Sequence, residues 1–305
     1  MSATTRLVTV DSTGSTNDDL RQELAPAGRL DAAAADRWPH GSALRALAQT
    51  AGRGRGGRDW VTPPGGALTV SFVLRPLVPA SRLGWLPLLA GLAVRDALVP
   101  ALEGLPWRVR TKWPNDVIVE PTGEGAVGAD GEVPGWGRAR KIAGILAELI
   151  PAPGVGDGAG TPARREDAPA IILGIGVNAG QPPGALPVPW AASLRSLGAG
   201  GPWSDPGAVL GAVAPRLLRV LGEWEAAGGD PEGALTATGT LGQDLREACA
   251  TLGARVRVRA PDGEFSGTAV GLEPGLRLRP DDGGPERLVM AGDASVRAVD
   301  PPGRA

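Results

Sequence analysis

The sequence predicts an α+β fold in which a mixed sheet with flanking helices is followed by a small all-β barrel. Strand-like and helix-like apolar segments alternate along residues 7–227. The segment AIILGIGVN (170–178) is nearly continuous in apolar residues, as a strand buried on both faces should be. After Thr251, short alternating segments are separated by PDG, EPG and DDGG turns, a pattern typical of a small barrel.

The N-terminal elements can be assigned in order. LVTV (7–10) is a short strand, and Ser15 or Thr16 can cap the helix that follows it. The first turn of that helix carries two aspartates, which suit a helix N-terminus. SALRALAQ (42–49) fits a strand or a helix by pattern alone. We further expect a strand at 67–76, an apolar helix at 83–102, strands at 107–113, 141–150 and 170–178, and a helix at about 206–227 that is capped by Asp205 and ended by Gly228 and Gly229.

Two stretches interrupt this order. Residues 121–140 and 151–169 are rich in Gly, Pro and Ala and carry few large apolar side chains. Such composition favours flexible insertions. The change of pattern near residue 250 predicts a large domain at 1–250 and a small one at 251–305.

The composition excludes several classes of protein. A net charge of −2 and a pI near 5.6 argue against a surface built wholly for nucleic acid or anionic lipid. No basic segment followed by an apolar one opens the chain, and no run of eighteen apolar residues occurs, so we expect a soluble, cytoplasmic protein. Cys249 is the single cysteine and His40 the single histidine, which rules out a Cys/His metal cluster. We expect Cys249 to be a buried thiol and His40 not to be catalytic, so the chemistry must use Lys, Arg, Asp, Asn and backbone amides.

The most unusual segment is QTAGRGRGGRDW (49–60). A glycine-rich loop exposes backbone N–H groups, and Arg53, Arg55 and Arg58 can add charge-assisted hydrogen bonds to an anion. The loop lacks the Lys-Ser/Thr pair that closes a phosphate-binding P-loop. On its own it fits a solvated turn, a nucleic-acid contact or an anion-binding loop.

A second polar segment is TKWPNDVIV (111–119). Pro114 favours an extended Trp113, so the chain turns and presents Asn115 and Asp116 at a strand end. A plain hairpin connection explains the same residues equally well.

Two strands carry glycines where a ligand could approach. In KIAGILAEL we expect Lys141 and Ala143 on one face, with Gly144 allowing close backbone approach. In AIILGIGVN, period two places two glycines and the final asparagine on one face, as a trough that either a packed helix or a ligand would fill. These three residues are Gly174, Gly176 and Asn178.

Together and in this order, the motifs resemble those of the biotin protein ligases. The matching segments are Ser15-Thr16-Asn17, Gln49 to Arg58 with Trp60, Lys112 to Asp116, Lys141 to Leu146, and Gly174 to Asn178. The resemblance covers about residues 7–180. It implies a catalytic domain like that of the class II aminoacyl-tRNA synthetases, and the part after residue 250 resembles the SH3-like C-terminal barrel of the family.

The resemblance implies an ATP-dependent ligase. Members of the family join biotin to ATP, form biotinyl-5′-adenylate and pyrophosphate, and pass the biotinyl group to one lysine of a biotin carboxyl carrier protein. Biotin, ATP and Mg²⁺ are therefore the expected ligands. No helix-turn-helix segment precedes the first strand, so we expect no DNA binding. We also expect no membrane association, and a monomer or a homodimer.

The resemblance also assigns roles to residues. Arg53, Arg55, Lys141 and Asp116 are the expected catalytic residues, with Asp116 near either Mg²⁺ or the acceptor lysine. Biotin contacts are implied for Ser15, Thr16, Asn17, Gln49, Arg53, Gly54, Arg55, Lys141 and Gly144. Contacts with ATP or the adenylate are implied for Gly52, Arg53, Arg55, Trp60, Asn115, Lys141 and Asn178. Arg58 has no implied role, and we expect it to be a solvated surface side chain.

Two other functions remain to be weighed. A lipoate or octanoyl ligase shares the catalytic fold, but the GRGRGG loop disfavours it. A non-catalytic nucleic-acid binder could use the loop together with Arg108, Arg110 and Lys112, but it should interleave aromatic residues with the basic ones. Two phenylalanines and no tyrosine in the whole chain speak against that arrangement.

Overall fold

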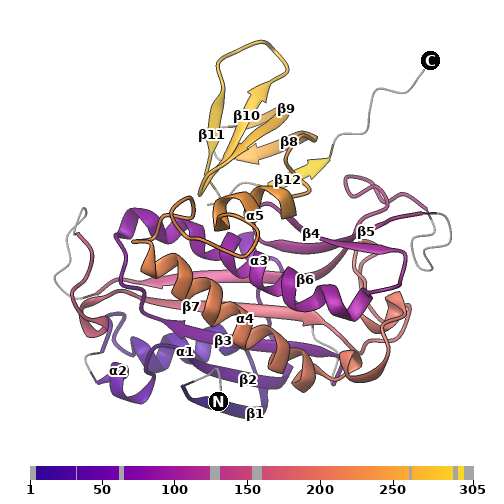
Figure 1. Ribbon diagram of the computed structural model, residues 1–305. Coiled ribbons are helices and arrows are strands. Elements are labelled where there is room, and N and C mark those ends of the chain that lie inside the picture. Colours follow the sequence, from indigo (N-terminus) through magenta and orange to yellow (C-terminus); the bar gives the residue numbers. More distant parts are fainter. Residues whose placement is uncertain are drawn as a thin grey trace, which may run out of the picture.

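We describe the fold from a computed structural model of the chain (Figure 1). It describes residues 5–31, 33–61, 65–123, 131–152, 160–260, 263–290 and 295–298. These residues form a seven-stranded sheet and a separate five-stranded sheet.

The large sheet has the strand order β1-β2-β3-β7-β6-β5-β4. β1 pairs with β2 in parallel, and every other neighbouring pair is antiparallel, which confirms the expected mixed sheet. Its strands are β1 (Leu7–Thr13), β2 (Ser42–Gln49), β3 (Ala67–Leu74), β4 (Trp107–Lys112), β5 (Asp116–Pro121), β6 (Arg140–Ile150) and β7 (Ala170–Asn178).

The small sheet is fully antiparallel and has the order β11-β10-β9-β8-β12. It stands at one end of the large sheet, above α5 in Figure 1. Its strands are β8 (Arg255–Ala260), β9 (Gly263–Leu272), β10 (Leu276–Pro280), β11 (Arg287–Val289) and β12 (Ser295–Ala298).

The two faces of the large sheet are covered by different helices. The described α-helices are α1 (Thr16–Leu24), α2 (Ala34–Arg37), α3 (Leu86–Leu98), α4 (Pro206–Ala226) and α5 (Leu241–Ala248). α3 and α4 run side by side across one face, where Leu173, Ile175 and Val177 of β7 join their core (Figure 1). On the other face, Leu20 and Leu24 of α1 are fully buried, and each stabilises the fold by about 1.5–3 kcal/mol.

The stretch Ala80–Leu102 is long and apolar enough to cross a membrane by length and composition, with a mean hydropathy of 1.4. It comprises α3 and the 3-10 helices Ala80–Trp85 and Val99–Leu102 that flank it. Most of the stretch is buried, because α3 packs against both the large sheet and the neighbouring helix α4.

Tertiary contacts decide several boundaries that pattern alone left open. The segment 42–49 is a strand because its first residues are buried between β1 and β3. The segment after Asp116 forms β5, so the region expected as an insertion from residue 121 begins within a strand. In its described part, 131–140, Val133 and Gly137 form a bridge. Within the two expected insertions, residues 124–130 and 153–159 lie outside the described residues.

Candidate active site

A cavity of about 420 Å³ lies on the large sheet, on the face opposite α3 and α4. Its walls come from the start of α1, the glycine-rich loop after β2, the β4–β5 hairpin, β6, β7, the segment 186–191 and β12. Gly52 is the one predicted site residue that does not line it. The predicted residues that line it are Ser15, Thr16, Asn17, Gln49, Arg53, Gly54, Arg55, Trp60, Asn115, Asp116, Lys141, Gly144 and Asn178.

The glycines of β7 make room for two side chains that cross the sheet. A Cβ atom on Gly174 would lie 2.5 Å from the Oδ1 atom of Asn17, and one on Gly176 would lie 2.4 Å from the indole ring of Trp60. No real Cβ atom tolerates such distances. The trough is therefore filled by α1 at one glycine and by the glycine-rich loop at the other, and the cavity opens beside them.

The start of α1 forms one end of the cavity. Ser15 caps the helix by accepting a hydrogen bond from the N–H of Asp18. The backbone N–H of Thr16 donates to Oε1 of Gln49 at 2.8 Å, and its hydroxyl lies 3.0 Å from the same oxygen. This fixes the amide of Gln49 so that its Nε2 atom is left to donate toward a ligand.

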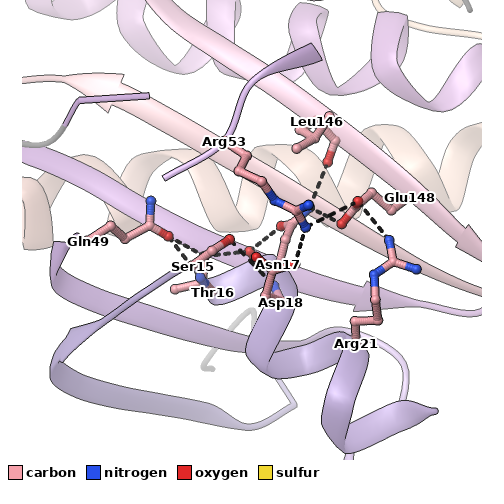
Figure 2. Close-up of polar contacts among 10 residues, drawn as sticks. Ser15, Thr16, Asn17, Asp18, Arg21, Gln49, Arg53, Leu146 and Glu148 are labelled. Carbon is pink, nitrogen blue, oxygen red and sulfur yellow. Dashed lines mark hydrogen bonds and ion pairs between the residues drawn. The ribbon is translucent and has the colours of Figure 1, made fainter. Parts of the chain in front are cut away.

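Asn17 is held as firmly. The hydroxyl of Ser71 on β3 donates to the Oδ1 atom of Asn17 at 2.6 Å. The Nδ2 atom of Asn17 donates to Oε2 of Glu148 at 2.8 Å (Figure 2). Nδ2 also lies 3.5 Å from the carbonyl oxygen of Leu146. Both N–H groups of the amide are thus directed at protein acceptors, while Oδ1 keeps one lone pair.

The glycine-rich loop is a narrow hairpin. The N–H of Gly54 donates to the carbonyl of Arg58 at 2.6 Å, and the N–H of Trp60 donates to the carbonyl of Gly52 at 2.8 Å. A Cβ atom on Gly52 would lie 2.4 Å from the carbonyl oxygen of Trp60, so this glycine lets the two arms meet. At the tip, Arg55–Gly57, the two glycines have φ values of 64° and 69°, which few other residues adopt.

The tip of the loop reaches the β4–β5 hairpin. Nη1 of Arg55 donates to Oδ1 of Asn115 at 3.3 Å, and Nδ2 of Asn115 donates to the carbonyl of Ile145 at 2.8 Å. Arg58 is exposed, as expected, but it also lines the cavity, and its Nε atom donates to the carbonyl of Arg55 at 3.1 Å. Arg58 thus stabilises the turn that carries Arg55.

The opposite end of the cavity is cationic. Nζ of Lys141 lies 2.6 Å from Oδ1 of Asp116. Burial tends to raise the pKa of Asp116, but the ammonium groups of Lys141 and Lys112 outweigh burial and lower it. Burial also lowers the pKa of Lys112 to about 8, although the carboxylate of Asp116 opposes the shift. This end thus holds two lysines around one carboxylate.

The expectation that Lys141 and Ala143 share a face is wrong. The pairing of β5 with β6 is irregular, because Ile118 opposes Lys141 whereas Val117 opposes Ala143. The extra residue reverses the alternation, as a β-bulge does. Ala143 is therefore in the core, and Lys141 lines the cavity together with Gly144. A Cβ atom on Gly144 would lie 3.0 Å from Nζ of Lys141.

The surroundings of Asp116 do not suit a resident Mg²⁺ ion. Its carboxylate is already paired with Lys141, and the positive charges of Lys112 and Arg58 are also near. Among the described residues, no group of three or more His, Cys, Asp or Glu side chains could hold a metal. A protein site for Mg²⁺ usually offers carboxylate oxygens free of such competition.

Sequence reasoning missed several residues of the cavity wall. Trp136, from the region expected to be a flexible insertion, is buried and stacks on Trp190 with ring centroids 6.1 Å apart. Nζ of Lys112 lies 4.6 Å from the centre of the Trp136 ring, and the guanidinium of Arg297 lies 5.4 Å from it. The one signal for Trp136 in the sequence is a large aromatic residue inside a Gly/Pro-rich stretch.

The amide of Asn178 already has hydrogen-bond partners within the protein, and the single cysteine and histidine lie where the sequence predicts. Nδ2 of Asn178 donates to the carbonyl of Ala192 at 3.1 Å, and its Oδ1 accepts from Gln181 at 3.2 Å. Cys249 is buried, as expected. His40 does not line the cavity; its Nδ1 atom accepts the backbone N–H of Arg75 at 3.0 Å.

The comparisons with known proteins agree with this geometry. A model of the biotin/lipoate A/B protein ligase family matches residues 29–156. A biotin–acetyl-CoA-carboxylase ligase of Mycobacterium tuberculosis is 34% identical over 94% of this chain and 88% of its own length. The bifunctional ligase/repressor BirA of Bacillus subtilis is 27% identical over 77% of this chain and 60% of its own length.

A solved structure shows the same fold. The biotin protein ligase of Aquifex aeolicus, in complex with biotin and ATP, aligns over 97% of this chain and 100% of its own, with a TM-score of 0.64 and 24% identity. The motifs of the cavity, the family model and the mycobacterial relative point the same way. The chain belongs to the biotin protein ligases of the biotin/lipoate A/B protein ligase family, and it is a ligase enzyme of that type.

Proposed function

We propose that the protein attaches biotin to a lysine of a biotin carboxyl carrier protein, at the expense of ATP and through biotinyl-5′-adenylate. The observation that supports this best is the cavity of about 420 Å³, in which neutral amides line one end and Lys141, Lys112 and Arg55 line the other. A neutral, hydrogen-bonding ring and an anionic reaction centre fit these two ends in that order. The mycobacterial relative carries the name of a biotin ligase.

The amide end suits the ureido ring of biotin. That ring presents N–H donors and a carbonyl acceptor, which must find partners once they leave water. Because Oε1 of Gln49 is occupied by Thr16, its Nε2 atom can donate to the ureido carbonyl. Because Nδ2 of Asn17 is occupied by Glu148, its Oδ1 atom can accept a ureido N–H. We assign the hydroxyl of Ser15 to the same ring.

The first step requires no protein nucleophile, since the biotin carboxylate attacks the α-phosphorus of ATP and pyrophosphate leaves. The protein must hold the reactants in line and stabilise the negative charge. Arg53, Arg55 and Lys141 line the cavity where they can do so. Because the surroundings of Asp116 do not suit a resident Mg²⁺ ion, the ion would be bound by the triphosphate rather than by this carboxylate.

In the second step the neutral amine of the acceptor lysine attacks the acyl carbon, the bond to the phosphate oxygen breaks, AMP leaves, and the amide nitrogen loses one proton to solvent. Asp116 is the carboxylate of the cationic end. Its lowered pKa makes it a weak base, so we assign it to orienting Lys141 and attracting the acceptor amine rather than to removing the proton. A loop closed over the adenylate would protect it from hydrolysis.

Two residues of the cavity wall, one aromatic and one with an amide side chain, suit the adenine base. We propose that adenine stacks on the indole ring of Trp60, which lines the cavity, and that Asn178 orients its edge, in addition to its contacts with Ala192 and Gln181. We also propose a division into a catalytic domain, 1–250, and an SH3-like domain, 251–305. A cytoplasmic location is consistent with this function.

The decisive experiment incubates the protein with biotin, ATP, Mg²⁺ and a biotin carboxyl carrier domain, and reads the carrier by mass spectrometry. We expect one biotinylated lysine, and no product when lipoate or octanoate replaces biotin. The lipoate arm is needed because the family model also covers lipoate ligases. Transfer of lipoate in place of biotin would refute the biotin assignment, and absence of any acyl transfer or pyrophosphate release would refute the ligase reaction itself.

A further inference from the structure

One carboxylate joins the amide end of the cavity to the glycine-rich loop. Glu148 on β6 is mostly buried, with 18% of its side chain exposed. Its Oε2 atom accepts the hydrogen bond from Asn17, whereas its Oε1 atom lies 2.7 Å from Nη2 of Arg21 and 3.8 Å from Nη2 of Arg53 (Figure 2). The two oxygens therefore serve two different parts of the site.

Asp18 completes the arrangement from the first turn of α1. Its Oδ1 atom forms an ion pair with Nη2 of Arg53 (Figure 2). Both carboxylate contacts of Arg53 among the described residues use that one nitrogen. A guanidinium group has five N–H donors, so Nε and Nη1 of Arg53 remain available to an anionic ligand.

The loop thus has two anchors on opposite sides of the cavity. Arg53 holds one arm to Asp18 and Glu148, while Arg55 holds the tip to Asn115. The loop around these anchors is rich in glycine, with Gly52, Gly54, Gly56 and Gly57, and glycine loses much conformational entropy when it is ordered. The ion pairs of Arg53 and the hydrogen bond of Arg55 are contacts that can offset this cost.

We propose that Glu148 and Asp18 are positioning residues that fix the arm of the loop carrying Arg53 over the amide end and so retain the acyl-adenylate. Glu148 has a second task, which is to orient the amide of Asn17 toward the ureido ring. The inference rests on the proposed function, because it assigns Asn17 and Arg53 to biotin and its adenylate. Neither carboxylate is a catalytic residue, since each acts through another side chain.

The competing explanation is purely structural. Asp18 lies in the first turn of α1, where a carboxylate stabilises the helix dipole, and Glu148 could serve only as a partner of Arg21. The two explanations differ in what each substitution changes. Glu148→Gln keeps an oxygen that can accept from Asn17 but removes the charge that attracts Arg53, whereas Glu148→Ala removes both. Asp18→Asn removes only the charge.

The test compares these three variants with the wild type and with Glu223→Gln. Glu223 pairs with Arg219 on the exposed side of α4, so this control removes an ion pair outside the cavity. Biotin affinity is measured by calorimetry, and adenylate retention by the rate at which preformed biotinyl-adenylate leaves the enzyme. Biotinylation of a carrier-free bystander protein gives a third readout.

We expect Asp18→Asn and Glu148→Gln each to release the adenylate about fivefold faster, the upper range for a half-exposed ion pair, and to label bystander lysines more. Their biotin Kd should stay within about twofold of the wild type, because the amide of Asn17 remains oriented. Glu148→Ala should release the adenylate as fast and also weaken biotin binding by about tenfold, the scale of one lost hydrogen bond to a charged group. Glu223→Gln should match the wild type.

Ionic strength supplies a readout that a purely structural role would not move. Salt screens half-exposed ion pairs, so a higher salt concentration should speed adenylate release from the wild type. It should change the release rate of the double variant Asp18→Asn/Glu148→Gln much less, because that variant lacks the two carboxylates. If the wild type forms the adenylate and both charge-removing variants retain it normally, the positioning role is wrong while the proposed function stands. If the wild type forms no adenylate, the proposed function itself fails. Should Glu148→Ala not fold, the two charge-removing variants still decide the question.

Discussion

The single histidine gives a sharp test of the structure, because no other side chain of the same type titrates near neutral pH. Burial lowers the pKa of His40 from 6.5 to about 4, the positive charge of Arg165 lowers it further, and the carboxylate of Glu225 opposes the shift. The folded protein therefore holds His40 neutral, with Nδ1 accepting the N–H of Arg75. Nη1 of Arg165 lies 3.1 Å from the same ring nitrogen.

The lowered pKa makes the stability depend on pH with a definite sign. Below pH 6.5 the unfolded chain takes up a proton that the folded chain does not bind until about pH 4, so stability falls across this window. A difference of about 2.5 pKa units corresponds to about 3 kcal/mol over the full window, at 1.36 kcal/mol per unit. Between about pH 7.5 and about pH 5 the loss should be about 2 kcal/mol.

Urea unfolding at a series of pH values measures this loss, and His40→Asn is the matched variant. An asparagine places an acceptor oxygen close to the position of Nδ1 but does not titrate. We expect the wild type to lose stability toward pH 5 and the variant to remain nearly flat, since most carboxyl groups titrate below about pH 4.5. Equal pH dependence in the two proteins, or a histidine NMR titration midpoint near 6.5 in the folded state, would show that the burial argument is wrong.

Three further substitutions test the cavity. Lys141→Ala should slow adenylate formation on the order of 10²-fold or more, measured by pyrophosphate release, and a nearly normal rate would remove this lysine from the mechanism. Gly176→Ala should displace the ring of Trp60 and cost about 1–3 kcal/mol of stability, whereas Gly211→Ala, with nothing within 4 Å of its added Cβ atom, should not destabilise the protein. Trp136→Ala should raise the KM for ATP several-fold without changing the Kd for biotin alone, because this ring lies beside Lys112 at the cationic end of the cavity. A change in biotin binding with an unchanged KM for ATP would contradict this prediction.

Local chemistry made part of the fold predictable from the sequence. Ser15 and Asp205 cap α1 and α4 as expected, because a side-chain oxygen at a helix start needs only its neighbours. Gly228 and Gly229 follow α4 with φ values of 64° and 81° for the same local reason. The period-two assignment of β7 was also correct, since that strand has no bulge and packs on both faces.

Contacts between distant segments could not be predicted in this way. The bulge that turns Lys141 into the cavity depends on how β5 pairs with β6, and nothing within β6 encodes it. Glu148 and Asn17 are far apart in sequence, so their hydrogen bond follows from strand order rather than from either motif. Trp136 and Arg297 meet only after the small sheet has docked, and their sequence neighbourhoods carry no sign of it.

The cavity has walls from both ends of the chain, from Ser15 on α1 to Arg297 on β12, and this has a consequence for biosynthesis. A ribosome that has released the strands of the large sheet still holds the last piece of the cavity wall. Contacts over such sequence separations also form late and slowly in folding. The nascent protein should therefore pass through a stage with a formed sheet and an incomplete site, and a label fused directly after residue 298 would sit beside that site.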